Sequence, residues 1–220
     1  MKRILIGAIM FAASAGPSLA VEIAGPQSLV SVSQYADVDP KQPYFNALQS
    51  LVERYGVANG FKTASGVDFR GDQALSRADM IMLIDGALDQ AAQLAEMTLM
   101  ELPPDQRDNA MKKLPIMRGA KCASMAARID SAKQIKDLKP SDPWFQSSVN
   151  LVEKWSIRIA STDGALRPAD PVSVADAREC LKIFSADGPS HQPQSLTRGD
   201  FALMLNEAME DFTSGLPAGN

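Results

Sequence analysis

An internal repeat constrains the fold of this chain more than any other feature. Residues 35–57 (YADVDPKQPYFNALQSLVERYGV) align without a gap with residues 135–157 (IKDLKPSDPWFQSSVNLVEKWSI). Beyond them, FRGDQALSRAD (69–79) aligns with LRPADPVSVAD (166–176), and residues 194–212 repeat only the second half of the unit. A repeat of this kind predicts similar supersecondary units that pack on one another.

Each full copy predicts two helices joined by a loop that contains glycine. In the first copy, the apolar spacing predicts a helix over 43–55, with Gly56 at its end. Ser76 followed by Asp79 is a capping box that begins a second helix, and Ser173/Asp176 and Thr197/Asp200 repeat this signal. The copies therefore predict three second-type helices that begin alike.

The helix that starts at Arg77 is expected to be long and to pack on other helices until Pro103 stops it. Its seam consists of residues spaced alternately four and three apart, namely Met80, Ile84, Ala87, Ala91, Leu94 and Thr98. A last helix is expected over 198–212, and one or two more within 105–134. No convincing stretch alternates with period two, so the predicted fold is mainly α.

The N-terminus has the pattern of an export signal. Two basic residues precede the apolar run ILIGAIMFAA, and the small residues Ser18 and Ala20 predict cleavage after Ala20. The expected organisation is a signal peptide (1–20), a first repeat (33–102), a helical connector (103–134), a second repeat (135–184), a partial third (185–212) and a disordered tail (213–220).

Composition excludes several classes of function. Without Lys2 and Arg3 the chain has 20 basic and 26 acidic residues, which argues against nucleic-acid binding. Cys122 and Cys180 are either a disulfide, as export allows, or two buried thiols. Neither cysteine has a neighbouring histidine and no phosphate loop is present, so we expect no metal, no cofactor and no catalysis.

Taken together, these residues resemble S-layer homology (SLH) motifs. That pattern has an Asp-Val or Asp-Leu turn, an aromatic pair that opens a helix, an "FRP"-like loop and a "TRAE"-like helix start. Here the loop reads Phe69-Arg70-Gly71 and Leu166-Arg167-Pro168, and the helix starts read SRAD (76–79), SVAD (173–176) and TRGD (197–200). The first copy is most similar to the SLH domain of cyanobacterial outer-membrane porins. The resemblance implies tandem helix–loop–helix units around a helical bundle.

The resemblance also implies binding to a peptidoglycan-linked polysaccharide, often a pyruvylated one. Arginine at a helix start can donate to a carboxylate, beside free backbone N–H groups. The candidate binding residues are Arg77, Arg198, Ser76, Thr197, Tyr44, Trp144, Asp37 and Arg70. The arginines could equally form salt bridges, the two aromatic residues could be half-buried packing, and Asp37 could cap a turn. Val174 replaces the arginine in the second copy, which predicts a groove that has lost binding.

The sequence thus predicts an exported, non-catalytic protein of the periplasm or cell wall that binds wall polysaccharide. The alternative is a structural adaptor with degenerate repeats, whose long helix binds a partner such as an outer-membrane protein. The third copy lacks its first half. A three-unit assembly therefore has to be completed by the central segment or by homo-oligomerisation.

Overall fold

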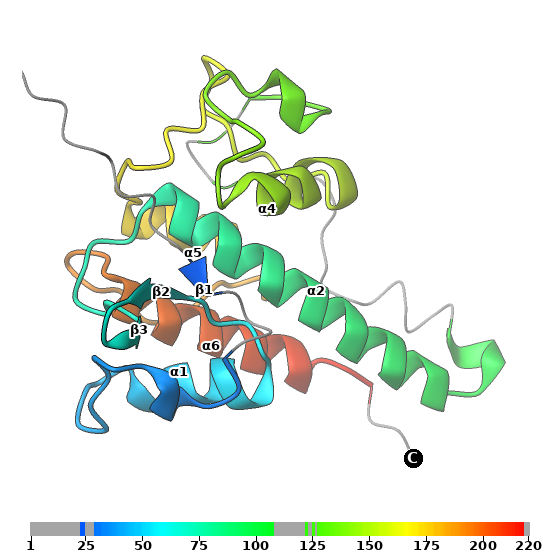
Figure 1. Cartoon of the computed structure of the whole chain (residues 1–220). Coiled ribbons are helices and arrows are strands. Elements are labelled where there is room, and N and C mark those ends of the chain that lie inside the picture. The colour runs from blue at the N-terminus through cyan, green and yellow to red at the C-terminus, as the bar shows by residue number, and fades with distance from the viewer. Residues whose placement is uncertain (1–22, 25–28, 108–121, 123–124, 126, 218–220) are drawn as a thin grey trace, which may run out of the picture.

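A computed structural model describes residues 23–24, 29–107, 122, 125 and 127–217, and these residues are mainly helical, as the sequence predicts (Figure 1). The long helix α2 (Arg77–Glu101) runs through the middle of the molecule. It packs against α4 (Phe145–Val149) on one side and against α6 (Arg198–Ser214) on the other. Helix α6 also contacts α1 (Phe45–Gln49) and α5 (Val174–Leu181).

The two first-type helices are longer than their α-helical parts. Each continues as one π-helical segment, Ser50–Arg54 after α1 and Asn150–Lys154 after α4. Each is preceded by a short 3₁₀ turn, Val32–Gln34 or Ala132–Gln134. The copies therefore share their local structure in detail.

A small antiparallel sheet is the main element that the sequence did not predict. Its strands are β1 (Ile23–Ala24), β2 (Gly60–Thr63) and β3 (Gly66–Asp68), in the order β1-β2-β3. Each strand has two to four residues, too few for an alternating pattern to be recognised in the sequence.

Some predicted segments lie outside the described residues, and others differ in their bounds from the prediction. The signal peptide and most of the helices expected within 105–134 lie outside the described residues, and residues 127–131 have no helix. The last helix continues to Ser214, two residues into the expected tail. Among the described residues, no helix has the length and apolarity needed to cross a membrane.

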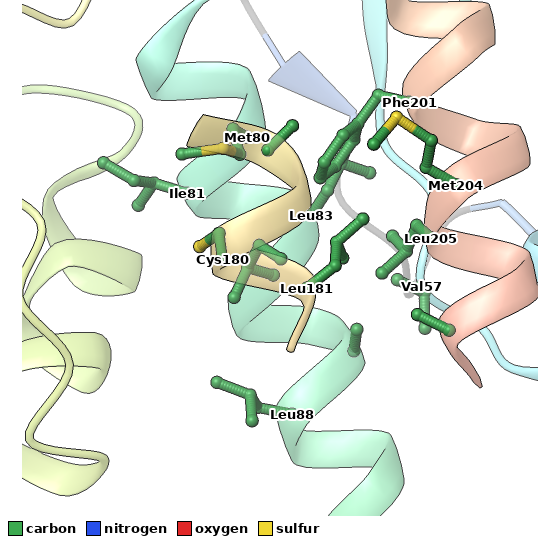
Figure 2. Close-up of a cluster of buried hydrophobic side chains, with 14 of the residues drawn as sticks. Val57, Met80, Ile81, Leu83, Leu88, Cys180, Leu181, Phe201, Met204 and Leu205 are labelled. Atoms are coloured by element: carbon green, nitrogen blue, oxygen red, sulfur yellow. The ribbon is translucent and has the colours of Figure 1, made fainter. Parts of the chain in front are cut away.

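The core lies where α2, α5 and α6 meet (Figure 2). Leu83 of α2, Leu181 of α5 and Phe201 of α6 are buried there. The predicted seam of α2 is buried at Met80, Ile84, Ala87 and Ala91, whereas Leu94 and Thr98 are only half-buried. The distal part of α2 is therefore less covered than its start.

The motif LVE, which both copies share, has a capping role as well as a packing role. Glu53 accepts hydrogen bonds from Ser31 Oγ (3.0 Å) and the Val32 N–H (3.1 Å). Glu153 does the same for Ser131 Oγ (2.9 Å) and the Ala132 N–H (3.1 Å). These bonds fix the 3₁₀ turn on the helix behind it, and the bond from the Val32 N–H lowers the pKa of Glu53.

The end of each first-type helix adopts a left-handed conformation. Gly56 has φ 62°, and Ser156 has φ 58° at the matching place. Only glycine adopts this conformation without cost. We expect Ser156→Gly to raise the free energy of unfolding by about 1 kcal/mol, and Gly56→Ser to lower it by a similar amount. Urea denaturation measures both changes in the free energy of unfolding. A change of the same sign in the two variants would contradict the left-handed conformation at these helix ends.

One carboxyl group lies in the interface between α2 and α4. Asp85 is 8% exposed, its Oδ2 accepts a hydrogen bond from Asn150 (3.1 Å), and its Oδ1 is buried without a partner among the described residues. Burial raises the pKa of Asp85 to about 6 and Asp89 adds to this, while bonds from Asn150 and Ser147 and the charge of Lys154 oppose it. Asn206 has the matching position in α6, nine residues after its N-cap residue.

Asn206, which has the matching position in α6, suggests a substitution that tests Asp85. The folded state binds the proton of the Asp85 carboxyl group more tightly than the unfolded chain does. The stability that this protonated group contributes is therefore present below about pH 4 and is lost as the pH rises through about 6. Asp85→Asn should therefore be about 1–2 kcal/mol more stable than the parent at pH 7.5 and equally stable at pH 4. Denaturant titrations at both pH values measure this, and a constant difference would refute it.

Candidate functional site

The starts of the three second-type helices meet at one place. Ser76, Ser173 and Thr197 are the N-cap residues of α2, α5 and α6, and each side chain accepts a bond from the backbone N–H three residues on. The backbone before α2 bonds to both neighbours, from the Leu75 N–H to the Leu196 carbonyl (3.1 Å) and from the Val172 N–H to the Leu75 carbonyl (2.9 Å). The capping motifs therefore form the centre of the assembly.

The starts of α2 and α6 are each held by the loop of a neighbouring segment. At α2, the Ala78 N–H donates to the Pro168 carbonyl (3.0 Å), and at α6 the Gly199 N–H donates to the Gly71 carbonyl (2.8 Å). Gly71 and Pro168 occupy the same place in the aligned copies. The loop of the second copy thus holds α2, and the loop of the first copy holds α6.

Arg198, a predicted ligand contact, is a buried structural residue, which corrects the prediction for this side chain. It is 1% exposed, donates to the Phe69 carbonyl (2.8 Å) and Asn59 Oδ1 (3.1 Å), and forms an ion pair with Asp79 at 2.6 Å. Burial lowers the pKa of Arg198, and the Asp79 carboxylate opposes that shift. Arg198 therefore holds the first loop and has no access to a ligand.

Arg77 makes the matching contact one unit further on. Its guanidinium donates to Ser161 Oγ (2.7 Å) and to the Leu166 carbonyl (3.1 Å), and Leu166 aligns with Phe69. The third arginine position is Val174, at the start of α5. In the sequence, the partial third copy lacks the first half that supplies such a loop in the two full copies.

Tyr44 closes the junction between the first copy and α6. It is 5% exposed, and a Cβ atom at Gly71 or Gly199 would lie 2.1 Å from its hydroxyl oxygen or 2.3 Å from its ring. Only glycine at both positions lets the ring fit between the two segments. Burial raises the pKa of Tyr44 to about 12. Tyr44 is therefore packing, the alternative that the sequence left open.

The equivalent junction between the second copy and α2 is open. Trp144 takes the place of Tyr44, Pro168 that of Gly71 and Ala78 that of Gly199, and Trp144 is only half-buried. A groove of about 800 Å³ lies here, lined by Phe61, Arg70, Gln73, Ser76, Ala78, Asp79, Met82, Ser141, Asp142, Pro143, Trp144, Pro168 and Ala169. It includes three of the predicted site residues, namely Ser76, Trp144 and Arg70.

Arg70 supplies the groove with a positioned cation that has no ion-pair partner among the described residues. Its φ is 59°, Asp37 Oδ2 accepts its backbone N–H (2.7 Å), and its guanidinium lies 4.2 Å from the centre of the Phe61 ring. No carboxylate is within ion-pair distance of it in the part of the chain that the structure describes. The matching Arg167 has φ 54° and pairs with Asp163 at 2.5 Å. The two equivalent arginines thus differ in what remains free to bind.

The other predicted residues lie outside this groove. Asp37 uses both oxygens on the backbone N–H groups of Phe69 and Arg70 (2.7 Å each), so it fixes the loop, and Asp137 does the same in the second copy. The Thr197 hydroxyl donates to Asp200 (2.7 Å) in the cap of α6. Sequence reasoning missed Phe61 and Pro168 because neither carries a recognisable chemical signal.

Cys122 and Cys180 are joined by a disulfide, so the structure has the bonded alternative rather than two thiols. The bond ties the connector to α5. Within the described residues, no group of three or more His, Cys, Asp or Glu side chains could hold a metal ion.

Comparison with known proteins gives little more. No family model matches the chain, and no solved structure matches it. The chain is similar to the uncharacterized protein alr4550 of Nostoc sp. (strain PCC 7120), with 33% identity over 103 residues. The match covers 47% of this chain and 17% of that protein.

Proposed function

We propose that this is an exported, non-catalytic protein of the cell envelope that binds an acidic, peptidoglycan-linked polysaccharide in the groove beside Trp144. The observation that carries the proposal is the difference between two equivalent junctions. Tyr44 fills one of them, while Trp144 leaves the other open beside an unpaired arginine.

The groove offers the contacts that an acidic sugar requires. The Trp144 ring lines the groove and supplies an aromatic face for a sugar ring, while its Nε1 is buried and is not counted among the donors to the ligand. Arg70 is positioned by its stacking on Phe61 and can donate two parallel bonds to a carboxylate. Because the chain is acidic, such a placed cation has to attract the anion locally.

The likeness to SLH motifs supports the rest of the proposal. In this interpretation the chain is a set of tandem SLH-like units around a helical bundle, exported by its N-terminal signal. The disulfide is compatible with an oxidising compartment such as the periplasm or the cell wall. The expected ligand is a wall polymer, pyruvylated or otherwise acidic.

Co-sedimentation with isolated sacculi that retain their polysaccharide tests the proposal. The parent protein should pellet with the sacculi, and Arg70→Asn should bind about tenfold more weakly, because one charge-assisted contact is lost. Asparagine tolerates the left-handed conformation. Arg167→Asn is the matched control, since it changes the equivalent left-handed arginine outside the groove. Absence of parent binding would refute the function, and equal binding by Arg70→Asn would refute the site.

A second candidate is the adaptor function. Met97 and Met100 are 55% and 66% exposed on the distal part of α2, which in Figure 1 extends beyond the neighbouring helices. An exposed apolar helix end of this kind fits a partner protein of the envelope. Recovery of a specific envelope protein by the parent but not by Met97→Glu/Met100→Glu, with no binding to sacculi, would favour this function.

A further inference from the structure

A second cavity lies at the opposite end of the helix that begins beside Trp144. Its volume is about 370 Å³, and it is lined by Arg128, Ile129, Asp130, Val152, Glu153, Ser156 and Arg158. The α4 helix and its π segment, Phe145–Lys154, separate it from the groove by about 15 Å. The two are therefore distinct sites, and a ligand of this second cavity lies beyond the proposed function.

Two arginines are brought together in this cavity. The Ala127 N–H donates to the Ala160 carbonyl (3.2 Å), and the Cys122 N–H donates to the Arg158 carbonyl (3.4 Å). These bonds hold the segment that carries Arg128 along the segment that carries Arg158. Within the described residues, neither guanidinium has a hydrogen bond or an ion pair. Two like charges that line one cavity without an ion-pair partner among the described residues favour an anion between them.

The carboxylates of the cavity do not take that role. Glu153 accepts bonds from Ser131 Oγ and the Ala132 N–H, as Glu53 does for Ser31 and Val32 in the first copy. Its function there is to fix a turn. Asp130 is exposed at the cavity wall, where it can accept a bond from a ligand hydroxyl group.

The first copy is an internal control for what the fold itself requires. Ala58 stands where the second copy has Arg158, and Gly56 stands where it has Ser156. The first copy forms the same helix end with these neutral residues. Ser156 adopts a left-handed φ of 58° that glycine adopts more easily, and it lines the cavity. Arg158 and Ser156 are thus additions that the fold does not need.

We propose that this cavity binds an oxyanionic group, a carboxylate or a phosphate, between Arg128 and Arg158, with the Ser156 hydroxyl as a further donor. Guanidinium groups match both anions in geometry. Asp130 and Glu153 lower the local positive charge. A singly charged group on a hydroxylated ligand, such as a sugar acid, therefore fits better than a free dianion.

The test is a titration of the mature protein with glucuronate, inorganic phosphate and neutral glucose, followed through the ¹⁵N–¹H signals of the arginine side chains. Glucuronate or phosphate should shift the Arg128 and Arg158 signals with a Kd on the order of 1 mM, and glucose should not. The anion that binds more tightly identifies the chemical source. Arg158→Ala, which installs the residue of the first copy, should raise the Kd at least tenfold.

Two further variants keep the test specific. Ser156→Gly removes the donor and relieves the backbone, so the Kd should rise a few fold while the protein stays folded. Arg70→Asn, which alters the groove, should leave this Kd unchanged. An absence of shifts at 20 mM of either anion, about twenty times the expected Kd, would overturn the proposal. Unchanged affinity in Arg158→Ala would overturn it as well.

Discussion

Replacement of Arg198 by methionine should lower the free energy of unfolding by about 3–5 kcal/mol. The guanidinium is 1% exposed and pairs with Asp79, so methionine leaves a carboxylate without its counter-ion. It also removes the donors of the Phe69 carbonyl and Asn59 Oδ1. Urea denaturation followed by circular dichroism measures the loss.

Two comparisons separate the causes of this loss. Arg77→Met removes the equivalent contact where the side chain is half-buried and has no ion pair among the described residues, so its loss should be about 1–2 kcal/mol. Asp79→Asn combined with Arg198→Met should recover part of the stability, because no unpaired charge remains. A loss below about 1 kcal/mol in Arg198→Met would contradict the assignment of Arg198 as a buried structural residue that holds the first loop.

Removal of the disulfide should have a comparable effect. Cys122 and Cys180 are 58 residues apart in sequence, and a loop of this length corresponds to about 4 kcal/mol of unfolded-chain entropy. Cys122→Ala/Cys180→Ala should therefore unfold at a clearly lower urea concentration than the oxidised parent. Alanine is the replacement of choice because both sites are buried, at 1% exposure each.

The reduced parent is the control for this prediction. With a reductant present it should behave like the double variant, because both lack the same cross-link. A free-thiol count on the unfolded, unreduced parent should give none. Two free thiols in that assay, or a parent whose stability does not respond to reductant, would contradict the bond.

Local signals in the sequence predicted the helical part of the fold well. The caps at Ser76, Ser173 and Thr197 occur where S-x-x-D and T-x-x-D predict them, since these bonds involve residues within one turn. The predicted seam of α2 is fully buried at its first four positions, while Leu94 is partly buried against the core and Thr98 is half-buried, because fewer neighbours cover the end of the helix. Spacing shows which face of a helix is apolar but not where along its length the partners stop.

Contacts between segments could not be derived in this way. The roles of Arg77 and Arg198 depend on carbonyl groups 89 and 129 residues away in the chain, which no local pattern encodes. Gly199 is a similar case, because the ring of Tyr44 explains it only once the two segments are placed together. Glu53 lies in the helix predicted over 43–55, and nothing in that local pattern shows that it holds a turn 21 residues earlier.

In the candidate groove, too, the sequence identified individual residues but not the contacts between segments. The sequence singled out Ser76, Trp144 and Arg70, which the fold brings together, along with Tyr44 and Arg198, which it buries. The likeness between the copies made both aromatic residues equal candidates. Their surroundings make them different, because glycines flank Tyr44 and larger residues flank Trp144.

The most direct test of the central claim is the fluorescence of Trp144 itself. The chain has two tryptophans, so Trp155→Phe leaves Trp144 as the single reporter inside the groove. Titration of this variant with solubilised wall polysaccharide should give a saturable change in emission. The same change should need about tenfold more polysaccharide in the Trp155→Phe/Arg70→Asn protein. Binding of the polysaccharide to the Trp155→Phe protein without any change in Trp144 emission would contradict the groove as the binding site.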